Sequence, residues 1–396
     1  MTSPTSPFAE PAFYADRYPT YAALRAASPV LQVPLEGGAT TATVVTGYDA
    51  ARQAFTASLS KNTGAYFADK PSNRSLHPAV ARSMLTVDPP EHTRLRRLVT
   101  KAFTPARVNA LRPYIRSLAE QFVGLWEPGN EVDLIEELAG PLPVTVICQL
   151  LGVLPSDRAA IRSWSTDLFA SGDHQRIDAA SHALAGYMTE LIAAKRAHPD
   201  HSLLADLIAV HDDDADRLSE GELLSLAVLL LVAGHETTTA GIGNAVLALI
   251  QHPADLQHLR TSPHCIPGAV DELLRYDSPV SIATWRWAPD AVDLSGSQVP
   301  SGSPVFVCPG AANRDPLRFP DPDRLDLDRA NAASHIAFGH GIHRCLGAPL
   351  ARAEIEIVLG VLLERFPGLQ LAIPAEQLVW RRSRLVRGLE ALPVRL

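Results

Sequence analysis

The sequence predicts a mainly α-helical fold with small peripheral β-sheets. The dominant hydrophobic period along the chain is helical, and the β-like runs are few and short. The stretch 289–335 is rich in Pro, Asp and Gly, which is typical of an irregular meander. A helical protein with long loops suits a buried cofactor better than a simple helix bundle does.

No linker or internal repeat divides the 396 residues. We therefore expect a single domain over residues 1–396, in which 1–17 form a loosely ordered N-terminal tail. Hydrophobic residues make up 46% of the chain and charged residues 20%, which favours a large core and argues against global disorder.

Charge and terminal sequence limit the possible partners. Lys and Arg number 35 against 43 Asp and Glu, a net charge of −8, so no nucleic-acid partner is expected. The N-terminus carries no secretion signal, and no apolar run reaches the ~18 residues of a membrane-spanning helix. The four cysteines are scattered without a Cys-x-x-Cys pair. These features predict a cytoplasmic protein that does not enter a membrane.

Local signals place elements along the chain. Asp88 is expected to cap a helix that carries His92 and Arg96 on one side. Thr104 is expected to cap the next helix, with Pro105 at its first position. The predicted helices include 104–126, 156–170 and 177–197, and the predicted short strands are 43–46, 282–287 and 305–308.

The longest predicted helix begins at a capping box. Ser219 and Glu222 have the Ser-x-x-Glu spacing, and apolar periodicity continues to about Gln251, before Pro253. At 1.5 Å per residue this helix would be roughly 45 Å long. Its middle carries the polar cluster 234–238.

One face of this helix mixes apolar and polar side chains. The stripe consists of Leu226, Leu230, Ala233 and Thr237, spaced four, three and four residues apart. A core stripe is the simplest interpretation, and it suffices for Leu226. Ala233 and Gly234 are small, however, and Glu236 with Thr237 forms an acid–hydroxyl pair that is costly in a core unless it has a use.

A glycine-rich loop at 338–347 reads Phe-Gly-His-Gly-Ile-His-Arg-Cys-Leu-Gly. Its three glycines let the backbone bend sharply and approach a flat object closely. The apolar run 346–366 predicts a helix that begins at Cys345, and the positive end of a helix lowers the pKa of a thiol. Such a thiolate is suited to bind iron.

Two other interpretations of Cys345 remain at this point. A cysteine outside a disulfide is most often a buried structural residue, which is the role expected for the other three cysteines. His340, His343 and Cys345 also lie close enough in sequence to suggest zinc, although no fourth ligand with suitable spacing stands out.

The pattern Phe-Gly-x-Gly-x-His-x-Cys-x-Gly resembles the haem-binding loop of the cytochromes P-450, and every fixed position matches. The similarity extends over nearly the whole chain, and it is strongest to soluble actinobacterial members that act in secondary metabolism. The resemblance implies a haem b buried between the long central helix and the helix of the Cys loop. It also implies that Cys345 is the axial ligand of the iron.

The same resemblance assigns further residues to the haem. His92 and Arg96 would bind one propionate, and Arg286 and His343 the other, unless the first two belong to a solvated basic face, as is expected for Arg94 and Arg97. The full set implied at the haem is His92, Arg96, Ala233, Gly234, Arg286, Phe338, Gly339, His343, Cys345 and Gly347.

Glu272 and Arg275 stand three residues apart on one predicted helix face. A surface ion pair, worth about 0–1 kcal/mol, would be the simplest interpretation. In the cytochromes P-450, this Glu-x-x-Arg is a buried structural pair joined by an Arg from the meander. We expect Arg324 to be that residue.

Residues 233–238 resemble the family's oxygen-activation motif, Ala-Gly-x-Glu/Asp-Thr-Thr. The resemblance implies that Thr237 donates a hydrogen bond to bound dioxygen and that Glu236 relays protons. His235 is expected to face outward. The substrate pocket is expected to be lined by Met84, Leu85, Leu230, Ala233, Val280, Ile282, Ala283 and Leu385.

These features together predict a haem-thiolate monooxygenase that uses O2 to hydroxylate, epoxidise or couple an apolar secondary metabolite, such as a polyketide. Gly241 and Gly243 lie inside a predicted helix and do not form Gly-x-Gly-x-x-Gly, so electrons from NAD(P)H would arrive through a separate ferredoxin and ferredoxin reductase. A peroxide-driven enzyme is less favoured because Glu236 and Thr237 are both present. A zinc hydrolase would need His where the chain has Thr239. A non-catalytic haem sensor of the same fold is the alternative.

Overall fold

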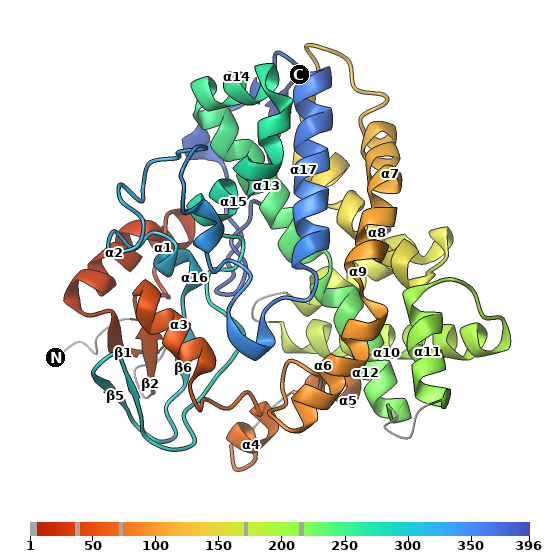
Figure 1. Cartoon of the computed structure of the whole chain (residues 1–396), viewed down its shortest axis with the longest axis vertical. Helices are drawn as coiled ribbons and strands as arrows, with labels where there is room; N and C mark the ends of the chain where they lie inside the picture. The colour runs from red at the N-terminus through yellow and green to blue at the C-terminus, as the bar shows by residue number, and fades with distance from the viewer. Residues whose placement is uncertain (1–5, 36–39, 71–73, 170–172, 214–217) are drawn as a thin grey trace. The chain divides into compact units, whose positions relative to one another are not determined.

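The computed structural model describes residues 6–35, 40–70, 74–169, 173–213 and 218–396 (Figure 1). The chain forms two compact units. The first comprises 1–60, 116–139 and 237–396, and the second comprises 61–115 and 140–236. The described residues are mostly helical and hold three small β-sheets, which confirms the predicted fold class.

The main sheet of the first unit has three strands. β1 (Val30–Pro34) pairs antiparallel with β2 (Thr41–Val45), and β2 pairs parallel with β6 (Val305–Val307). Because alternate residues of a strand face opposite sides, Val44 and Val45 enter two different apolar clusters. The cluster around Val45 includes residues of α3 (Tyr48–Thr56), which lies beside the sheet in Figure 1.

The two other sheets are smaller. One has the order β3 (Glu131–Asp133), β8 (Pro393–Arg395) and β7 (Gln370–Leu371). The other is the hairpin of β4 (Val292–Leu294) and β5 (Ser297–Val299). The strand predicted at 282–287 is wrong: only isolated bridges form there, among them Trp287 with Ser60 and Trp287 with Pro304.

Residues 6–17 pack within the first unit. α1 (Pro11–Ala15) and α2 (Tyr18–Ala27) follow each other, and Phe8 and Phe13 are 2% and 1% exposed. The two rings meet edge to face at 5.2 Å inside the second apolar cluster. The expected loose tail is therefore wrong for residues 6–17, because burying these two rings fixes the segment. Residues 1–5 lie outside the described residues.

The remaining helices fill out each unit. The first unit contains α14 (Pro253–Thr261), α15 (Ile266–Tyr276), α16 (Pro309–Ala312) and α17 (Ala348–Arg365). The second contains α4 (Thr63–Phe67), α5 (Pro78–Ala81), α6 (Glu91–Ala102), α8 (Pro141–Leu151), α9 (Arg158–Leu168), α10 (His174–Ala197), α11 (Leu203–Asp213) and α12 (Glu220–Ala233). The boundary between the two units falls inside two helices, α7 (Pro105–Phe122) and α13 (Glu236–Gln251), so each of them has residues in both units.

The predicted helix starts are partly correct. Thr104 Oγ1 accepts a hydrogen bond from the backbone N–H of Arg107, as a cap of α7 should, although α7 ends at Phe122 rather than 126. Asp88 does not cap α6. Its carboxylate accepts a hydrogen bond from the backbone N–H of Lys61 instead, and α6 begins three residues later, at Glu91.

The long helix begins at the predicted capping box of Ser219 and Glu222, but it is interrupted. α12 ends at Ala233 and α13 begins at Glu236, with Gly234 as the cap of α12. A Cβ atom on Gly234 would lie 2.7 Å from the Leu230 carbonyl oxygen and 2.9 Å from the Ile147 side chain, so only glycine fits there. The combined stretch 220–251 is long and apolar enough to cross a membrane, but 61% of its apolar window is buried inside the protein, as in the core helix of a soluble protein.

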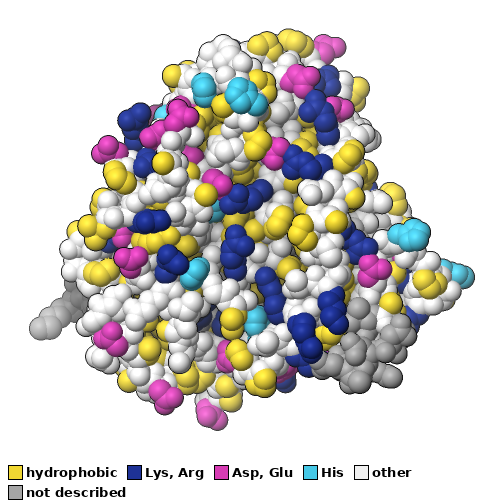
Figure 2. Space-filling view, in the orientation of Figure 1, with side chains coloured by type: hydrophobic (Ala, Val, Ile, Leu, Met, Phe, Trp, Pro, Cys, Tyr) yellow, Lys and Arg dark blue, Asp and Glu magenta, His cyan; other side chains and the backbone are white. Residues whose placement is uncertain are grey.

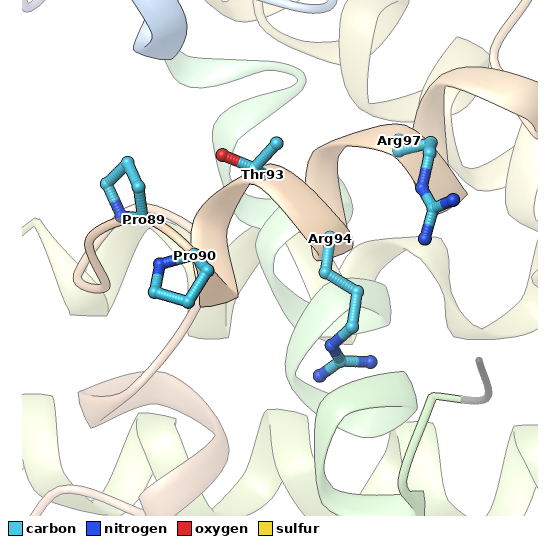
Figure 3. A pocket seen from close by; sticks show the side chains of 5 residues that line it. All are labelled: Pro89, Pro90, Thr93, Arg94 and Arg97. Atoms are coloured by element: carbon cyan, nitrogen blue, oxygen red, sulfur yellow. The ribbon is translucent and has the colours of Figure 1, made fainter.

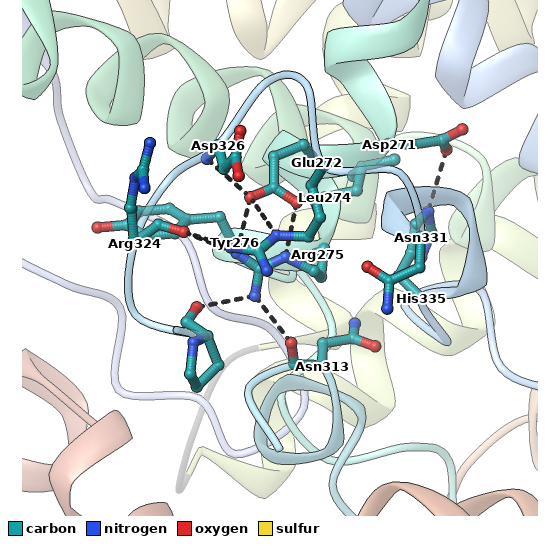
Figure 4. Close-up of polar contacts among 12 residues, drawn as sticks. Asp271, Glu272, Leu274, Arg275, Tyr276, Asn313, Arg324, Asp326, Asn331 and His335 are labelled. Carbon is teal, nitrogen blue, oxygen red and sulfur yellow. Dashed lines mark hydrogen bonds and ion pairs between the residues drawn. The ribbon is translucent and has the colours of Figure 1, made fainter. Parts of the chain in front are cut away.

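Glu272 on α15 forms a buried ion-pair cluster, shown in Figure 4. The carboxylate is fully buried and accepts two hydrogen bonds from Arg275, of 2.6 and 2.8 Å. Arg275 in turn donates to the carbonyl oxygens of Asn313 and Pro322. The predicted pair is thus buried and hydrogen-bonded, and it connects the meander to α15.

The third charged member of this cluster is Arg329, so the expectation of Arg324 is wrong. Arg329 Nε lies 3.1 Å from Glu272 Oε1, whereas the Arg324 side chain is exposed. Arg324 takes part only through its carbonyl oxygen, which accepts hydrogen bonds from Arg275 and Arg329. The meander is irregular, so residue spacing alone does not determine which side chain points inward.

We predict that Arg329→Ala lowers the free energy of unfolding by about 2–4 kcal/mol, because it leaves the buried Glu272 with one cation fewer. Arg324→Ala keeps the carbonyl contacts and should change that free energy by no more than about 0.5 kcal/mol. Urea unfolding of the two variants measures the difference, and equal losses would contradict the assignment of Arg329.

Candidate functional site

The Cys loop places its thiol at the surface of the first unit. Cys345 is exposed, and its backbone N–H donates to the Phe338 carbonyl oxygen at 2.9 Å. Gly339 and Gly341 have φ of 72° and 74°, a backbone region that favours glycine. A Cβ atom on Gly341 would also lie 2.8 Å from the Phe55 carbonyl oxygen. The glycines thus allow the loop to turn tightly against α3.

The helix after the loop begins slightly later than predicted. α17 starts at Ala348, three residues after the cysteine, and Gly347 precedes it as the cap. A Cβ atom on Gly347 would lie 3.9 Å from Cys345 Sγ, so the thiol lies next to the first turn. A helix N-terminus favours negative charge nearby, which suits a thiolate ligand.

The ring of Phe338 contacts His335 and Arg352. The His335 ring lies 5.7 Å from the Phe338 ring, and the Arg352 guanidinium lies 5.6 Å from it. His335 Nε2 and Arg352 both pair with Asp271, the residue before Glu272 on α15. Figure 4 shows Asp271 pointing toward His335 on the opposite side of α15 from the Glu272 cluster. α15 therefore orients the Cys loop.

The other three cysteines differ from Cys345. Burial raises the pKa of Cys148 and of Cys308 to about 12, so both stay neutral thiols, and Cys265 is half-buried. Within the described parts of the chain, no group of three His, Cys, Asp or Glu residues could hold a metal ion on its own. Of the four cysteines, Cys345 has the most accessible thiol.

Arg286 is a buried cation of the first unit that has no carboxylate next to it among the described residues. It is 4% exposed, donates to the Thr284 carbonyl oxygen at 2.9 Å and lies 4.7 Å from the Phe55 ring centre. No carboxylate of the described residues lies within 4 Å of it, and burial lowers its pKa to about 10. A buried guanidinium is stable only with an anion beside it, and a haem propionate is such an anion. The residues present therefore fit a haem.

His92 and Arg96 lie together on α6 of the second unit. His92 is 1% exposed, and its pKa is lowered by burial and then by the positive charge of Arg96. His92 is thus a neutral imidazole at neutral pH, able to donate one N–H to a carboxylate. Arg96 is half-buried beside it. The structure brings this pair together as predicted.

Two other arginines of α6, Arg94 and Arg97, lie away from the His92–Arg96 pair. Arg94 and Arg97 line an open hollow of about 600 Å³ together with Pro89, Pro90 and Thr93 (Figure 3). Arg97 is exposed, as expected for a solvated face. Arg94 differs from that expectation, because it is half-buried and forms an ion pair with Glu222.

The junction of α12 and α13 carries the acid–hydroxyl pair. Glu236 is 5% exposed, and its Oε1 accepts a hydrogen bond of 3.0 Å from Thr166 Oγ1 of α9. His235 is also buried, with Nδ1 3.0 Å from the Leu231 carbonyl oxygen and Nε2 3.8 Å from Glu236 Oε1. The outward orientation expected for His235 is therefore wrong. Thr237 is half-buried.

The expected pocket residues fall into two groups. In the first unit, Ser281 N–H donates to the Leu385 carbonyl oxygen, and Val280 pairs with Val386, so Val280 and Leu385 lie side by side. Ala283 is partly buried next to the main sheet. Ile282 differs, because it is 5% exposed and packs into the apolar cluster around Phe8.

In the second unit, the loop after α5 lies against α12. Ser225 Oγ on α12 donates to the Arg82 carbonyl oxygen at 2.7 Å, which places the loop with Met84 and Leu85 beside this helix. Met84 is 5% exposed, and Leu85 and Leu230 are half-buried. Ala233 is exposed at the end of α12.

The sequence analysis missed Glu354, a fully buried acid on α17. Neither of its carboxyl oxygens has a hydrogen-bond partner in the described part of the chain, and burial raises its pKa well above the ordinary value. The signal was present, because Leu350 and Val358 lie four residues before and after it and are both buried. An acid between two core positions predicts a neutral carboxyl group.

We predict that Glu354→Gln makes the protein more stable at high pH. The folded protein keeps the Glu354 proton that the unfolded chain releases, so wild-type stability falls as pH rises above the ordinary carboxyl pKa of 4.5. Between pH 5 and pH 8, the Tm of the variant should fall less than that of the wild type. Glu356→Gln, half-buried on the same helix, is the control. Parallel Tm curves for wild type and Glu354→Gln would contradict the neutral carboxyl group.

Comparisons with known proteins agree with this geometry. The cytochrome P-450 family profile matches residues 156–262 and 265–371. The cytochrome P-450 monooxygenase PikC of Streptomyces venezuelae is 44% identical, over 97% of this chain and 92% of its own. The 6-deoxyerythronolide B hydroxylase of Saccharopolyspora erythraea is 40% identical, over 97% of each chain.

A solved structure shows the same fold. The tirandamycin C-bound monooxygenase TamI superposes with a TM-score of 0.89 at 41% identity, covering 98% of this chain and 99% of its own. These relatives are named as hydroxylases or monooxygenases, which supports an enzyme and gives no support to a haem sensor. The chain belongs to the cytochrome P-450 family of haem-dependent monooxygenases.

Proposed function

We propose that this monooxygenase inserts one oxygen atom of O2 into a polyketide-derived secondary metabolite, by hydroxylation or epoxidation. The observation that carries the proposal is an identity of 40–44%, over 80% or more of the chain, to enzymes whose names state such substrates. Among them are the 6-deoxyerythronolide B hydroxylase and, at 44% identity over 80% of each chain, the mycinamicin IV hydroxylase/epoxidase of Micromonospora griseorubida. Oxidative coupling would use the same cofactor and is a second possible outcome of the substrate assay below.

The side chains proposed for the pocket support an apolar substrate. Met84, Leu85, Leu230, Val280 and Leu385 offer no charge and no hydrogen-bonding side chain. Ala233 and Ala283 are small, which leaves room for a bulky molecule. An apolar lining binds a macrolide-sized scaffold chiefly by removing its surface from water.

We assign the haem contacts residue by residue. Cys345 would bind the iron, because it has the most accessible of the four thiols and lies beside the start of α17. Arg286 and His343 would hold one propionate, and His92 and Arg96 the other. Phe338, Gly339, Gly347, Ala233 and Gly234 would contact the macrocycle. When bound, the haem would activate O2 with two electrons and two protons, so that one oxygen atom of O2 enters the substrate and the other leaves as water.

The protein's own part in this reaction is proton delivery at α12 and α13. Thr166 Oγ1 holds the Glu236 carboxylate inside the protein, so the acid is oriented rather than free to move in solvent. Glu236 would take up a proton and pass it toward the haem, and Thr237 would donate a hydrogen bond to the bound oxygen molecule. Ala233 and Gly234 would leave space for that molecule.

We propose a cytoplasmic enzyme that receives electrons from NAD(P)H through a ferredoxin and a ferredoxin reductase. Figure 2 shows Lys and Arg side chains on the face of the molecule that it draws. Arg344, directly before Cys345, is exposed. A positive surface attracts an acidic electron carrier and speeds its encounter with the enzyme.

We predict that Arg96→Ala releases haem more readily than Arg97→Ala does. Both arginines are on α6, but Arg96 is half-buried beside His92, and Arg97 is exposed in the hollow of Figure 3. Loss of one charge-assisted hydrogen bond to a propionate costs about 1.5–3 kcal/mol, so haem should dissociate roughly 10–100-fold faster from Arg96→Ala. Transfer of haem to excess apomyoglobin measures both rates. Equal rates would instead place Arg96 on the solvated face.

We predict that Thr237→Ala and Glu236→Ala disturb different steps. Mass spectrometry of products from a panel of macrolactone, terpenoid and peptide scaffolds first identifies a substrate. Thr237→Ala should then still consume reductant but release hydrogen peroxide in place of product. Glu236→Ala should slow turnover by about 10²–10⁴-fold, the usual contribution of a positioned acid.

Thr166→Val is the matched test of the acid's position. It removes the hydroxyl that holds Glu236 and leaves both proposed catalytic side chains in place, so it should slow turnover less than Glu236→Ala does. All three variants should keep the spectrum of thiolate-ligated haem, because none touches Cys345. Normal coupling of reductant to product in both Thr237→Ala and Glu236→Ala would make the pair structural.

A further inference from the structure

Two arginines of the first unit are buried side by side, away from its Cys loop in sequence. Arg17 immediately precedes α2 and is 1% exposed. Arg387 lies in the C-terminal segment where Trp380 pairs with Leu389, and it is 5% exposed. Both guanidinium groups lie where the start of α2 meets the C-terminal segment, because Arg17 Nη2 is 3.5 Å from the Ser383 carbonyl oxygen and the Arg387 guanidinium is 5.3 Å from the ring of Tyr18, the residue after Arg17. Burying two like charges together is costly unless negative charge accompanies them.

Asp277 is the carboxylate that hydrogen-bonds directly to this pair among the described residues, and the exposed Asp16 acts on Arg387 only as a nearby negative charge. Asp277 Oδ1 accepts a hydrogen bond of 2.6 Å from Arg387 Nε and another of 2.7 Å from the Tyr18 hydroxyl. No carboxylate within the described ranges lies within 4 Å of Arg17. Its nearest acceptor is the carbonyl oxygen of Ser383, 3.5 Å from Nη2, which is a weak contact. Arg17 thus has no carboxylate in direct contact, although the charge of Asp277 acts on it from further away.

Three donor atoms of the pair also lack acceptors. Arg17 Nε, Arg17 Nη1 and Arg387 Nη1 are buried and have no hydrogen-bond partner among the residues described. The aromatic rings nearby lie against the guanidinium groups, at 5.1 Å for Phe13 on Arg17 and 3.6 Å for Trp380 on Arg387. Such rings attract a cation, but each contact is worth only about 0.5–2 kcal/mol and removes no charge.

We propose that Arg17 and Arg387 together bind a small monovalent inorganic anion, with chloride as the physiological occupant. A water molecule could accept hydrogen bonds from these donors, but it would leave the excess positive charge in place. An anion satisfies both requirements at once. Bound there, it links the start of α2 to the C-terminal segment, and so stabilises the N-terminal aromatic cluster of Phe8, Phe13 and Tyr21.

The first test is the thermal stability of the holoenzyme in chloride. Chloride replaces gluconate from 1 to 300 mM at constant ionic strength, so that general screening stays fixed. An anion that binds only the folded state should raise the wild-type Tm by roughly 2–4 °C, and the rise should level off once the site is full. Arg17→Gln and Arg387→Gln should lose this response.

Arg25→Gln is the matched control. Arg25 lies on α2 as well, but its guanidinium donates to the Ala311 carbonyl oxygen and it faces neither Arg17 nor Arg387 in the contacts described. This variant should keep the full chloride response. A wild-type Tm that does not depend on chloride, or an equal response in Arg17→Gln, would overturn the proposal.

A second measurement is independent of whether the variants fold. Wild-type crystals soaked in sodium bromide should show an anomalous peak within about 3.5 Å of Arg17 Nη1 and Arg387 Nη1, the usual reach of a hydrogen bond to a large halide. Density there without an anomalous signal would show that water alone occupies the site, and the proposal would fail.

Discussion

The fold around the thiol depends on two consecutive acidic residues of α15. Glu272, fully buried, collects Arg275 and Arg329 and so ties the meander to the helix. Asp271 collects His335 and Arg352, which bracket Phe338 at the start of the Cys loop. Because the two carboxylates leave the helix in different directions, one turn of α15 fixes both the meander and the Cys loop, which lie well after it in sequence. Ion pairs buried in this way contribute little net stability, but removing one partner is costly, so they determine geometry.

Two buried carboxyl groups show how environment decides the role of an acid. Glu236 has a hydroxyl partner in Thr166 and a histidine nearby, so it is hydrogen-bonded where the helix is interrupted. Glu354 has no hydrogen-bond partner among the residues described, and burial keeps it protonated. Glu236 is suited to passing a proton because Thr166 orients its carboxyl group and because the helix is interrupted next to it, at Gly234. Glu354 is a neutral group inside a core helix.

The sequence predicted the features that local chemistry controls. The capping box of Ser219, the start of α7 after Thr104 and the tight turns at Gly339 and Gly341 all depend on residues within a few positions of one another. The pairing of Glu272 with Arg275 also follows from local spacing, because residues three apart on a helix lie close together. Family resemblance added the expectation that the pair is buried.

The predictions that failed needed information from distant parts of the chain. Arg329 rather than Arg324 reaches Glu272, because the path of an irregular meander follows its hydrogen bonds to carbonyl oxygens and has no period. Ile282 is part of the core because it packs into an apolar cluster with Phe8 and Phe306, which come from distant parts of the chain. His235 lies in the interruption between α12 and α13, where helical periodicity does not determine which side chains are buried. No periodic pattern in the sequence encodes these three outcomes.

The distribution of buried charge connects the proposed haem site with the proposed anion site. The chain as a whole carries a net charge of −8, yet several of its most buried charged side chains are arginines. Arg275 is balanced by Glu272, and Arg387 by Asp277. Arg286 and Arg17 have no carboxylate within 4 Å among the residues described. A core cannot keep such charges without partners, so in each case the missing partner is expected to be an anion that is not part of the polypeptide. For Arg286 we propose that this anion is a propionate of the cofactor. For Arg17, which lies beside a second arginine and a ring cluster, it is a small ion, and the same electrostatic requirement therefore accounts for both sites.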